Sequence, residues 1–175
     1  MKEVSQIMCL DPAETALTLL AEDEVSFVSH GQDESDLLNY MKWYGISVGS
    51  DGSSLAVDGP LGEGWPHPRN FGTFPRILAR YVREKKVLTL QDAVRRMTSA
   101  SAQRLGLKDR GLLRAGFWAD ITLFDPDTVE DKATFREPKQ YPAGIPYVIV
   151  NGQVVIDNGC HTGQMPGKVL RYCGC

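Results

Sequence analysis

Apolar residues recur with a helical period through much of the chain between residues 11 and 105. The first predicted helix starts at Asp11, because Asp11 can cap the first turn, Pro12 suits the first helical position and Glu14 completes a capping box. Four further helical patterns follow at residues 33–43, 76–82, 89–97 and 99–105. Four arginines are expected on the solvent faces of these helices with no special role: Arg76, Arg80, Arg95 and Arg96.

Short β-branched runs predict strands between and after these helices. Residues 25–29 and 46–48 fall between helical patterns, and this helix–strand alternation is typical of a parallel α/β architecture. Later in the chain, a strand is predicted within 119–126 and a hairpin at 147–156, where Asn151-Gly152 is a strong tight-turn signal. We therefore expect an α/β part followed by a small antiparallel β subdomain.

Residues 52–75 interrupt the pattern with glycine, proline, serine and asparagine, among which aromatic residues are interspersed. A loop of this length within a compact domain is usually functional or disordered. Its aromatic and polar side chains favour an ordered lid over a linker.

Composition and charge narrow the class of protein. The 175 residues are 42% hydrophobic and 23% charged, which is a globular composition. The net charge of −3 argues against an electrostatic nucleic-acid partner. No apolar run is long enough to span a bilayer and residues 1–14 lack the apolar core of a signal peptide, so we expect a soluble, cytoplasmic protein with no membrane partner. The length also falls short of the roughly 250 residues of a complete (β/α)₈ barrel.

The four cysteines do not form a recognisable metal motif. Cys9, Cys160, Cys173 and Cys175 lack the paired spacing of a zinc ribbon, although His161 follows Cys160 directly. Cysteines of a cytosolic protein are usually free thiols, and we expect that state here.

Asp51 is the first candidate for chemistry, because it follows the predicted strand 46–48 and acids at such strand ends form active sites in α/β folds. A carboxylate there can bind a divalent metal and accept a proton. Position alone nevertheless favours a turn residue, since Ser50-Asp51-Gly52 is ordinary turn sequence.

Other candidates lie in the long loop and near its start. Arg69 could bind a substrate carboxylate, and His67 could donate a hydrogen bond or ligate a metal, although a solvated loop histidine is the simpler interpretation. His30 could face the same site, with a capping or solvated role favoured. Three scattered histidines without a His-x-His pair do not make a hydrolytic metal site.

The motifs, taken in order, resemble the C-terminal part of the N-acyl-D-amino-acid deacylases, or D-aminoacylases, of the amidohydrolase superfamily. The resemblance covers residues 10–171, and it is carried by segments 49–52, 67–69, 72–76, 88–90, 97–99, 104–107, 109–111, 116–120, 141–145, 150–152 and 161–163.

The resemblance implies an α/β fold made of the C-terminal part of a zinc-dependent (β/α)₈ barrel, residues 1–110 with active-site loop 52–75, followed by a small β-sandwich-like subdomain, residues 111–175. It implies hydrolysis of the amide of N-acyl-D-amino acids. Asp51 matches the family's general base, which relays a proton to the leaving amine, and a metal ligand. His67 and Arg69 inherit a substrate-binding expectation.

This chain departs from the family because the His-x-His pair, the bridging cysteine and the later histidine ligands have no counterpart in it. We therefore expect a segment that is inactive in isolation, with zinc the cofactor of the full-length family and none bound in this chain. Two alternatives stay open: a non-catalytic, self-associating module of the same fold, and a related cyclic-amide enzyme such as a dihydroorotase or hydantoinase. The His-Pro-Arg and Gly-Thr-Phe-Pro-Arg motifs disfavour the second.

Overall fold

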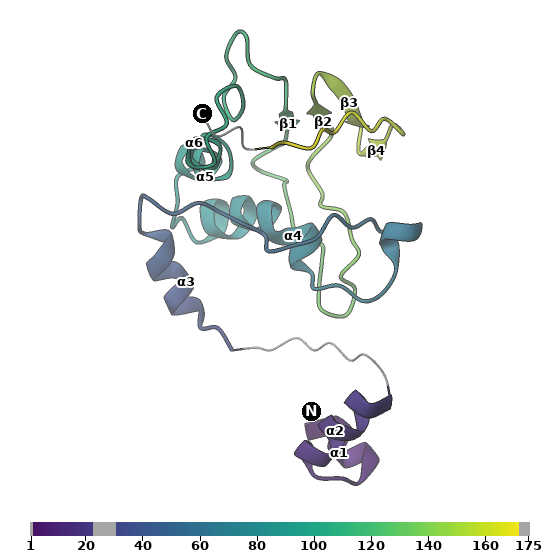
Figure 1. Ribbon diagram of the computed structural model, residues 1–175. Helices are drawn as coiled ribbons and strands as arrows, with labels where there is room; N and C mark the ends of the chain where they lie inside the picture. The colour runs from purple at the N-terminus through teal and green to yellow at the C-terminus, as the bar shows by residue number, and fades with distance from the viewer. Residues whose placement is uncertain (1, 23–30, 172–175) are drawn as a thin grey trace. The chain divides into compact units, whose positions relative to one another are not determined.

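The computed structural model describes residues 2–22 and 31–171 (Figure 1). The chain divides into two units, Met1–Gln32 and Asp33–Cys175. The strand predicted at 25–29, together with His30, Cys173 and Cys175, lies outside the described residues. The boundary predicted between residues 110 and 111 falls inside the larger unit, and it stays a prediction.

The smaller unit consists of helices α1 (Lys2–Met8) and α2 (Pro12–Glu22). The Asp11 carboxylate accepts hydrogen bonds from the backbone N–H groups of Ala13 and Glu14, at 2.8 and 3.3 Å. This cap confirms the predicted start of α2, because it satisfies donors that the first turn leaves without a partner.

The helices of the larger unit precede its strands along the chain. They are α3 (Glu34–Met41), η1 (Pro60–Gly62), α4 (Arg69–Arg76), η2 (Ile77–Glu84), α5 (Leu90–Met97) and α6 (Ser99–Arg104). Asp33 caps α3 through Ser35, and Thr89 caps α5 through Asp92, which confirms both predicted starts. Within residues 2–22 and 31–171, no helix is long and apolar enough to cross a membrane.

The loop predicted over 52–75 is wrong at its C-terminal end, because α4 begins at Arg69 and continues directly into η2. The imidazole Nδ1 of His67 accepts the backbone N–H of Arg69 at 3.0 Å, so a side chain supports the start of the helix. Pro75 lies inside α4 and has no N–H for the helical ladder. The following turns take the wider hydrogen-bond spacing of a π-helix.

The strand predicted at 46–48 is also wrong, since these residues belong to no strand. A parallel strand needs a neighbour that supplies hydrogen bonds along its length. Here the N–H of Val48 donates to a helical carbonyl, that of Arg96, at 3.4 Å. The part of the chain that the structure describes therefore contains no parallel strand pair.

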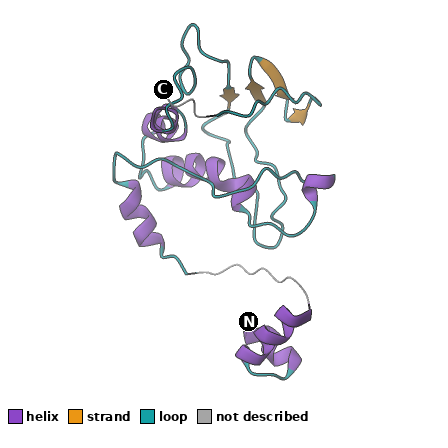
Figure 2. Cartoon of the chain, in the orientation of Figure 1, coloured by secondary structure: helices purple, strands orange, loops and turns teal. Residues whose placement is uncertain are grey.

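The predicted antiparallel β structure is present (Figure 2). Strands β1 (Ile121–Leu123), β2 (Tyr147–Val150), β3 (Gln153–Asp157) and β4 (Cys160–His161) form a four-stranded sheet in the order β1-β2-β3-β4. The hairpin predicted at Asn151-Gly152 is confirmed, with φ values of 47° and 81° that fit a type I′ turn. Cys160 lies on β4 and is exposed and free, as is Cys9 in the smaller unit, in agreement with the expected thiols.

The hydrophobic core of the larger unit joins its helices to a residue between β1 and β2. Its buried members are Met41, Ile77, Leu78, Tyr81, Leu88, Ala93 and Val129. Val129 is fully buried although it is distant in sequence from the helices. The region between β1 and β2 is therefore part of the helical core, and helices and sheet share one unit.

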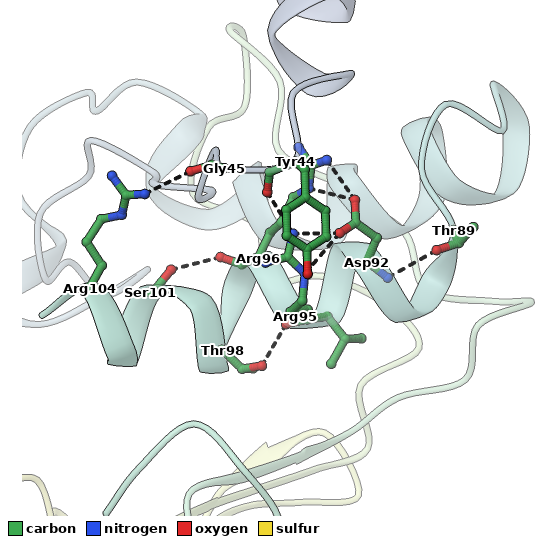
Figure 3. Close-up of polar contacts among 10 residues, drawn as sticks. Tyr44, Gly45, Thr89, Asp92, Arg95, Arg96, Thr98, Ser101 and Arg104 are labelled. Carbon is green, nitrogen blue, oxygen red and sulfur yellow. Dashed lines mark hydrogen bonds and ion pairs between the residues drawn. The ribbon is translucent and has the colours of Figure 1, made fainter. Parts of the chain in front are cut away.

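A charged cluster ties α5 to the residues that precede the long loop (Figure 3). The Asp92 carboxylate pairs with Arg95 at 2.8 Å and with Arg96 at 2.7 Å. Arg95 also donates to the carbonyl of Tyr44 and lies over its ring, 3.8 Å from the centroid. Arg96 is only 3% exposed, so the expectation of a surface arginine is wrong at that position.

These contacts set the charge state of Asp92. Burial opposes its ionisation, but the hydrogen bonds from Arg96 and Arg95 outweigh that effect and hold the pKa of Asp92 below its ordinary value of 3.8. The ionised carboxylate therefore stabilises the fold at neutral pH, and this contribution is lost as the pH falls below that value.

Replacing Asp92 tests this contribution. Asp92→Asn should lower the free energy of unfolding at pH 7 by about 2 kcal/mol, because it leaves the buried Arg96 without its counter-charge. The difference from the unmodified chain should shrink as the pH falls below about 3.8, where the wild-type carboxyl is protonated too. Urea unfolding at a series of pH values measures the loss of stability at pH 7 and its decrease at low pH. The exposed Asp58→Asn is the control. Equal stability at pH 7 would contradict the assignment.

Candidate active site

Asp51 is the central residue of an ST-turn, closed by the Ser50 side chain, in the irregular segment just beyond Val48. Its φ is +49°, in the left-handed region that acidic residues adopt more readily than most non-glycine residues. The two residues that follow Asp51 both donate their backbone N–H groups. Gly52 donates to Ser50 Oγ at 3.2 Å, and Ser53 donates to Asn70 Oδ1 at 2.6 Å. The turn is thereby tied to the start of α4.

The Asp51 carboxylate forms an ion pair with Arg69. The distance between Asp51 Oδ2 and Arg69 Nη2 is 2.9 Å, and the two side chains are 86% and 43% exposed. A pair this open to water contributes little to stability. The oxygen atoms of the Asp51 carboxylate are therefore accessible to solvent and to a ligand.

His67 completes a compact polar group. Its Nδ1 accepts the backbone N–H of Arg69, and its carbonyl accepts the side-chain N–H of Asn70 at 2.8 Å. The three residues singled out from the sequence, Asp51, His67 and Arg69, are thus brought together around one helix start. Asn70 was missed by sequence reasoning, although it joins the turn at Asp51 to His67.

The described residues do not fit a zinc site by themselves. Among them, no group of three or more histidine, cysteine, aspartate or glutamate side chains is placed to hold a metal ion. Asp51 is a single carboxylate whose identified partner is a cation, whereas zinc takes three or four protein ligands. The prediction of Asp51 as a metal ligand therefore stays a prediction, and the missing ligands would have to come from elsewhere.

A shallow surface hollow of the larger unit has none of these residues in its lining. Residues 116–119 line it together with Asn151 and Gly152. The Arg110 guanidinium beside this region is already bound to Asp120 and to Asn151 Oδ1. The candidate chemistry thus belongs to the exposed group at Asp51, where a carboxylate can exchange a proton and a guanidinium can bind an anion.

Comparison with known proteins identifies the class. The amidohydrolase family model matches residues 51–156, a segment that begins at Asp51 and includes α4, η2, α5, α6 and most of the sheet. The chain belongs to the amidohydrolase family.

Two relatives and one solved structure match most of this chain. A D-aminoacylase and an N-acyl-D-glutamate deacylase of Alcaligenes xylosoxydans xylosoxydans are 44% and 42% identical, each over 79% of this chain and 27% of the relative. A crystal structure of N-acyl-D-glutamate deacylase from Bordetella bronchiseptica, complexed with zinc and a phosphonate inhibitor, superimposes with a TM-score of 0.73 at 36% identity. That match covers 88% of this chain and 30% of the solved one. The chain thus spans about a quarter to a third of the relatives' length.

The exposed position of Asp51 leads to a stability prediction. Asp51→Asn should change the free energy of unfolding by less than about 0.5 kcal/mol, because asparagine accepts a left-handed backbone and an exposed ion pair contributes little. Thermal unfolding measures the change, with the exposed Asp127→Asn as the matched control. A loss of more than about 2 kcal/mol would instead make Asp51 a structural residue.

Proposed function

We propose that this chain is the C-terminal segment of a zinc-dependent hydrolase that cleaves the amide bond of N-acyl-D-amino acids. The observation that carries the proposal is the pairing of Asp51 with Arg69 at 2.9 Å beside His67, on a chain 44% identical to a D-aminoacylase. A proton acceptor and an anion-binding side chain are what hydrolysis of an acylated amino acid requires at neighbouring positions.

The roles follow from the groups themselves. Asp51 would take a proton from the water that attacks the acyl carbonyl and pass it to the amine nitrogen as the C–N bond breaks. Arg69 would bind the substrate carboxylate. His67 Nδ1 accepts the backbone N–H of Arg69, so the imidazole is held beside the guanidinium, where it would contribute to substrate binding.

The zinc that the resemblance implies would supply Lewis-acid chemistry when bound. The described residues supply no cage for it, so we expect its ligands to lie in the part of the relatives that this chain does not match. The substrate-binding roles of His67 and Arg69 and the base role of Asp51 therefore belong to the complete enzyme, and a cytoplasmic location is proposed for it.

An assay of the purified chain tests whether the zinc ligands lie outside it. Residues 1–175 should show no hydrolysis of N-acetyl-D-amino acids above background, because a single carboxylate cannot hold the metal. Ninhydrin detection of the free amino acid and metal analysis measure activity and zinc, with the Alcaligenes D-aminoacylase as positive control. Stoichiometric zinc together with hydrolysis that Asp51→Ala abolishes would contradict the placement of the metal ligands outside this chain, while leaving the proposed reaction in place.

A second candidate function is a non-catalytic module that associates with its own copies. The exposed aromatic side chains that follow α3 favour it, since Trp43 and Tyr44 are 72% and 73% exposed. Exposed apolar side chains of this size are typical of contact surfaces when they lie close together.

Self-association predicts a mass in solution greater than that of the 19.4 kDa chain. Size-exclusion chromatography with light scattering should then give a dimer or larger species whose share falls on dilution, and Trp43→Ser should shift it towards monomer. The exposed Leu113→Ser, on another part of the chain, is the matched control. A monomer at all concentrations would remove this candidate.

A further inference from the structure

The chain between β1 and β2 forms a long loop whose two ends are paired with each other. Glu130 and Ala143 form an isolated antiparallel bridge, in which each donates its N–H to the other's carbonyl, at 3.2 and 3.0 Å. Residues 131–142 lie between these two positions and are called the clasp below. Figure 1 shows this green segment descending from the sheet beside α4, the helix that begins at Arg69.

Asp131 attaches the clasp to the C-terminal end of α4. One carboxylate oxygen of Asp131 accepts from Arg76 Nε at 2.7 Å and lies 2.6 Å from Arg76 Nη2, while the other accepts the N–H of Ala133. The Asp131 side chain is only 8% exposed. It lies so close to Gly72 that a Cβ at that position would come within 2.1 Å of the carboxylate, so the contact requires glycine. These contacts set the position of the clasp along the helix.

Aromatic and polar contacts attach the clasp to the segment that precedes α4. The rings of Phe135 and His67 meet edge to face, with centroids 5.1 Å apart and planes at 83°. The Phe135 carbonyl accepts the indole N–H of Trp65 at 3.1 Å. Further along, Lys139 donates to the carbonyl of Gly62. The clasp therefore contacts both sides of Arg69, from η1 to the end of α4.

The contact with His67 bears directly on the candidate site. The His67 ring can accept the backbone N–H of Arg69 in one orientation only, with Nδ1 towards the helix start. The perpendicular Phe135 ring lies against the imidazole in that orientation, and edge-to-face pairs of this kind favour one geometry. A rotation of His67 would break both contacts and would turn Nε2 away from its present direction.

We propose that the clasp positions the substrate-binding residues of the site, and that Phe135 and Asp131 are its positioning residues. Phe135 fixes the orientation of His67, and Asp131 fixes the register of α4 and so the place of Arg69. This rests on the proposed function in one respect, since only there do His67 and Arg69 face a substrate. The positioning itself is a property of the chain and is measurable without substrate.

The test uses the ¹⁵N-labelled full chain and two local NMR readouts. One is the ¹⁵N shift of His67 Nδ1, assigned with His67→Gln, which reports a hydrogen-bonded acceptor nitrogen. The other is the exchange rate of the Arg69 amide, which should rise roughly three- to tenfold in Phe135→Ala. The Nδ1 shift should move towards that of a ring without this bond. Phe135→Tyr keeps the ring and should restore both values.

Matched variants separate positioning from general loss of stability. Arg136→Ala changes an exposed side chain in the same segment and should leave both readouts unchanged. Trp65→Phe removes the indole donor to the Phe135 carbonyl at an exposed position, and it should shift His67 in the same direction by less. Asp131→Asn should speed exchange of the Arg69 amide. Thermal unfolding of each variant identifies any that do not fold, in which case Trp65→Phe carries the test.

Unchanged His67 and Arg69 signals in a folded Phe135→Ala or Trp65→Phe chain would overturn the proposal. So would equal changes in Arg136→Ala, because the effect would then not depend on the contacting side chains. A deacylase assay of the complete enzyme, as distinct from the assay of residues 1–175 above, is independent of these signals. Its failure in the complete enzyme would count against the proposed function alone, whereas a failure of the NMR test would count against the clasp alone.

Discussion

The arrangement of the larger unit depends on a buried guanidinium and the carboxylate that neutralises it. Arg96 is almost fully enclosed, and a charge in that position requires a partner such as Asp92. The backbone carbonyl of Arg96 also accepts the N–H of Val48 and the hydroxyl of Ser101. One residue therefore joins α5 to α6 and to the segment that leads into the turn at Asp51. The segment before Asp51 is therefore hydrogen-bonded to a residue of α5 far along the chain.

A second constraint on the site comes from the clasp, which lies later in the chain than the residues it contacts. Asp131 and Phe135 lie more than fifty residues beyond the segment they contact, so the site is assembled from three separate stretches: the turn at Asp51, the start of α4 and the clasp. Their mutual contacts are what bring the carboxylate, the imidazole and the guanidinium into one group.

The features predicted correctly from sequence are those that local chemistry determines. The caps at Asp33 and Thr89 and the turn at Asn151-Gly152 need only a few neighbouring residues. The strand at 46–48 failed because strand formation depends on a distant partner, and the burial of Arg96 was missed because its environment comes from several segments. Within the site, motif resemblance indicated Asp51, His67 and Arg69, but it gave no sign of Asn70 or the clasp.

The left-handed backbone at Asp51 has an evolutionary consequence. Glycine takes this conformation without a steric penalty, and asparagine takes it about as readily as aspartate does. With the side chain mostly in water, folding demands little at this position beyond a residue that accepts the left-handed backbone. A lineage that kept this fold after losing hydrolysis would be free to drift at position 51 towards glycine or asparagine. The residue found there in related sequences therefore records whether the chemistry is still under selection, independently of whether the fold is.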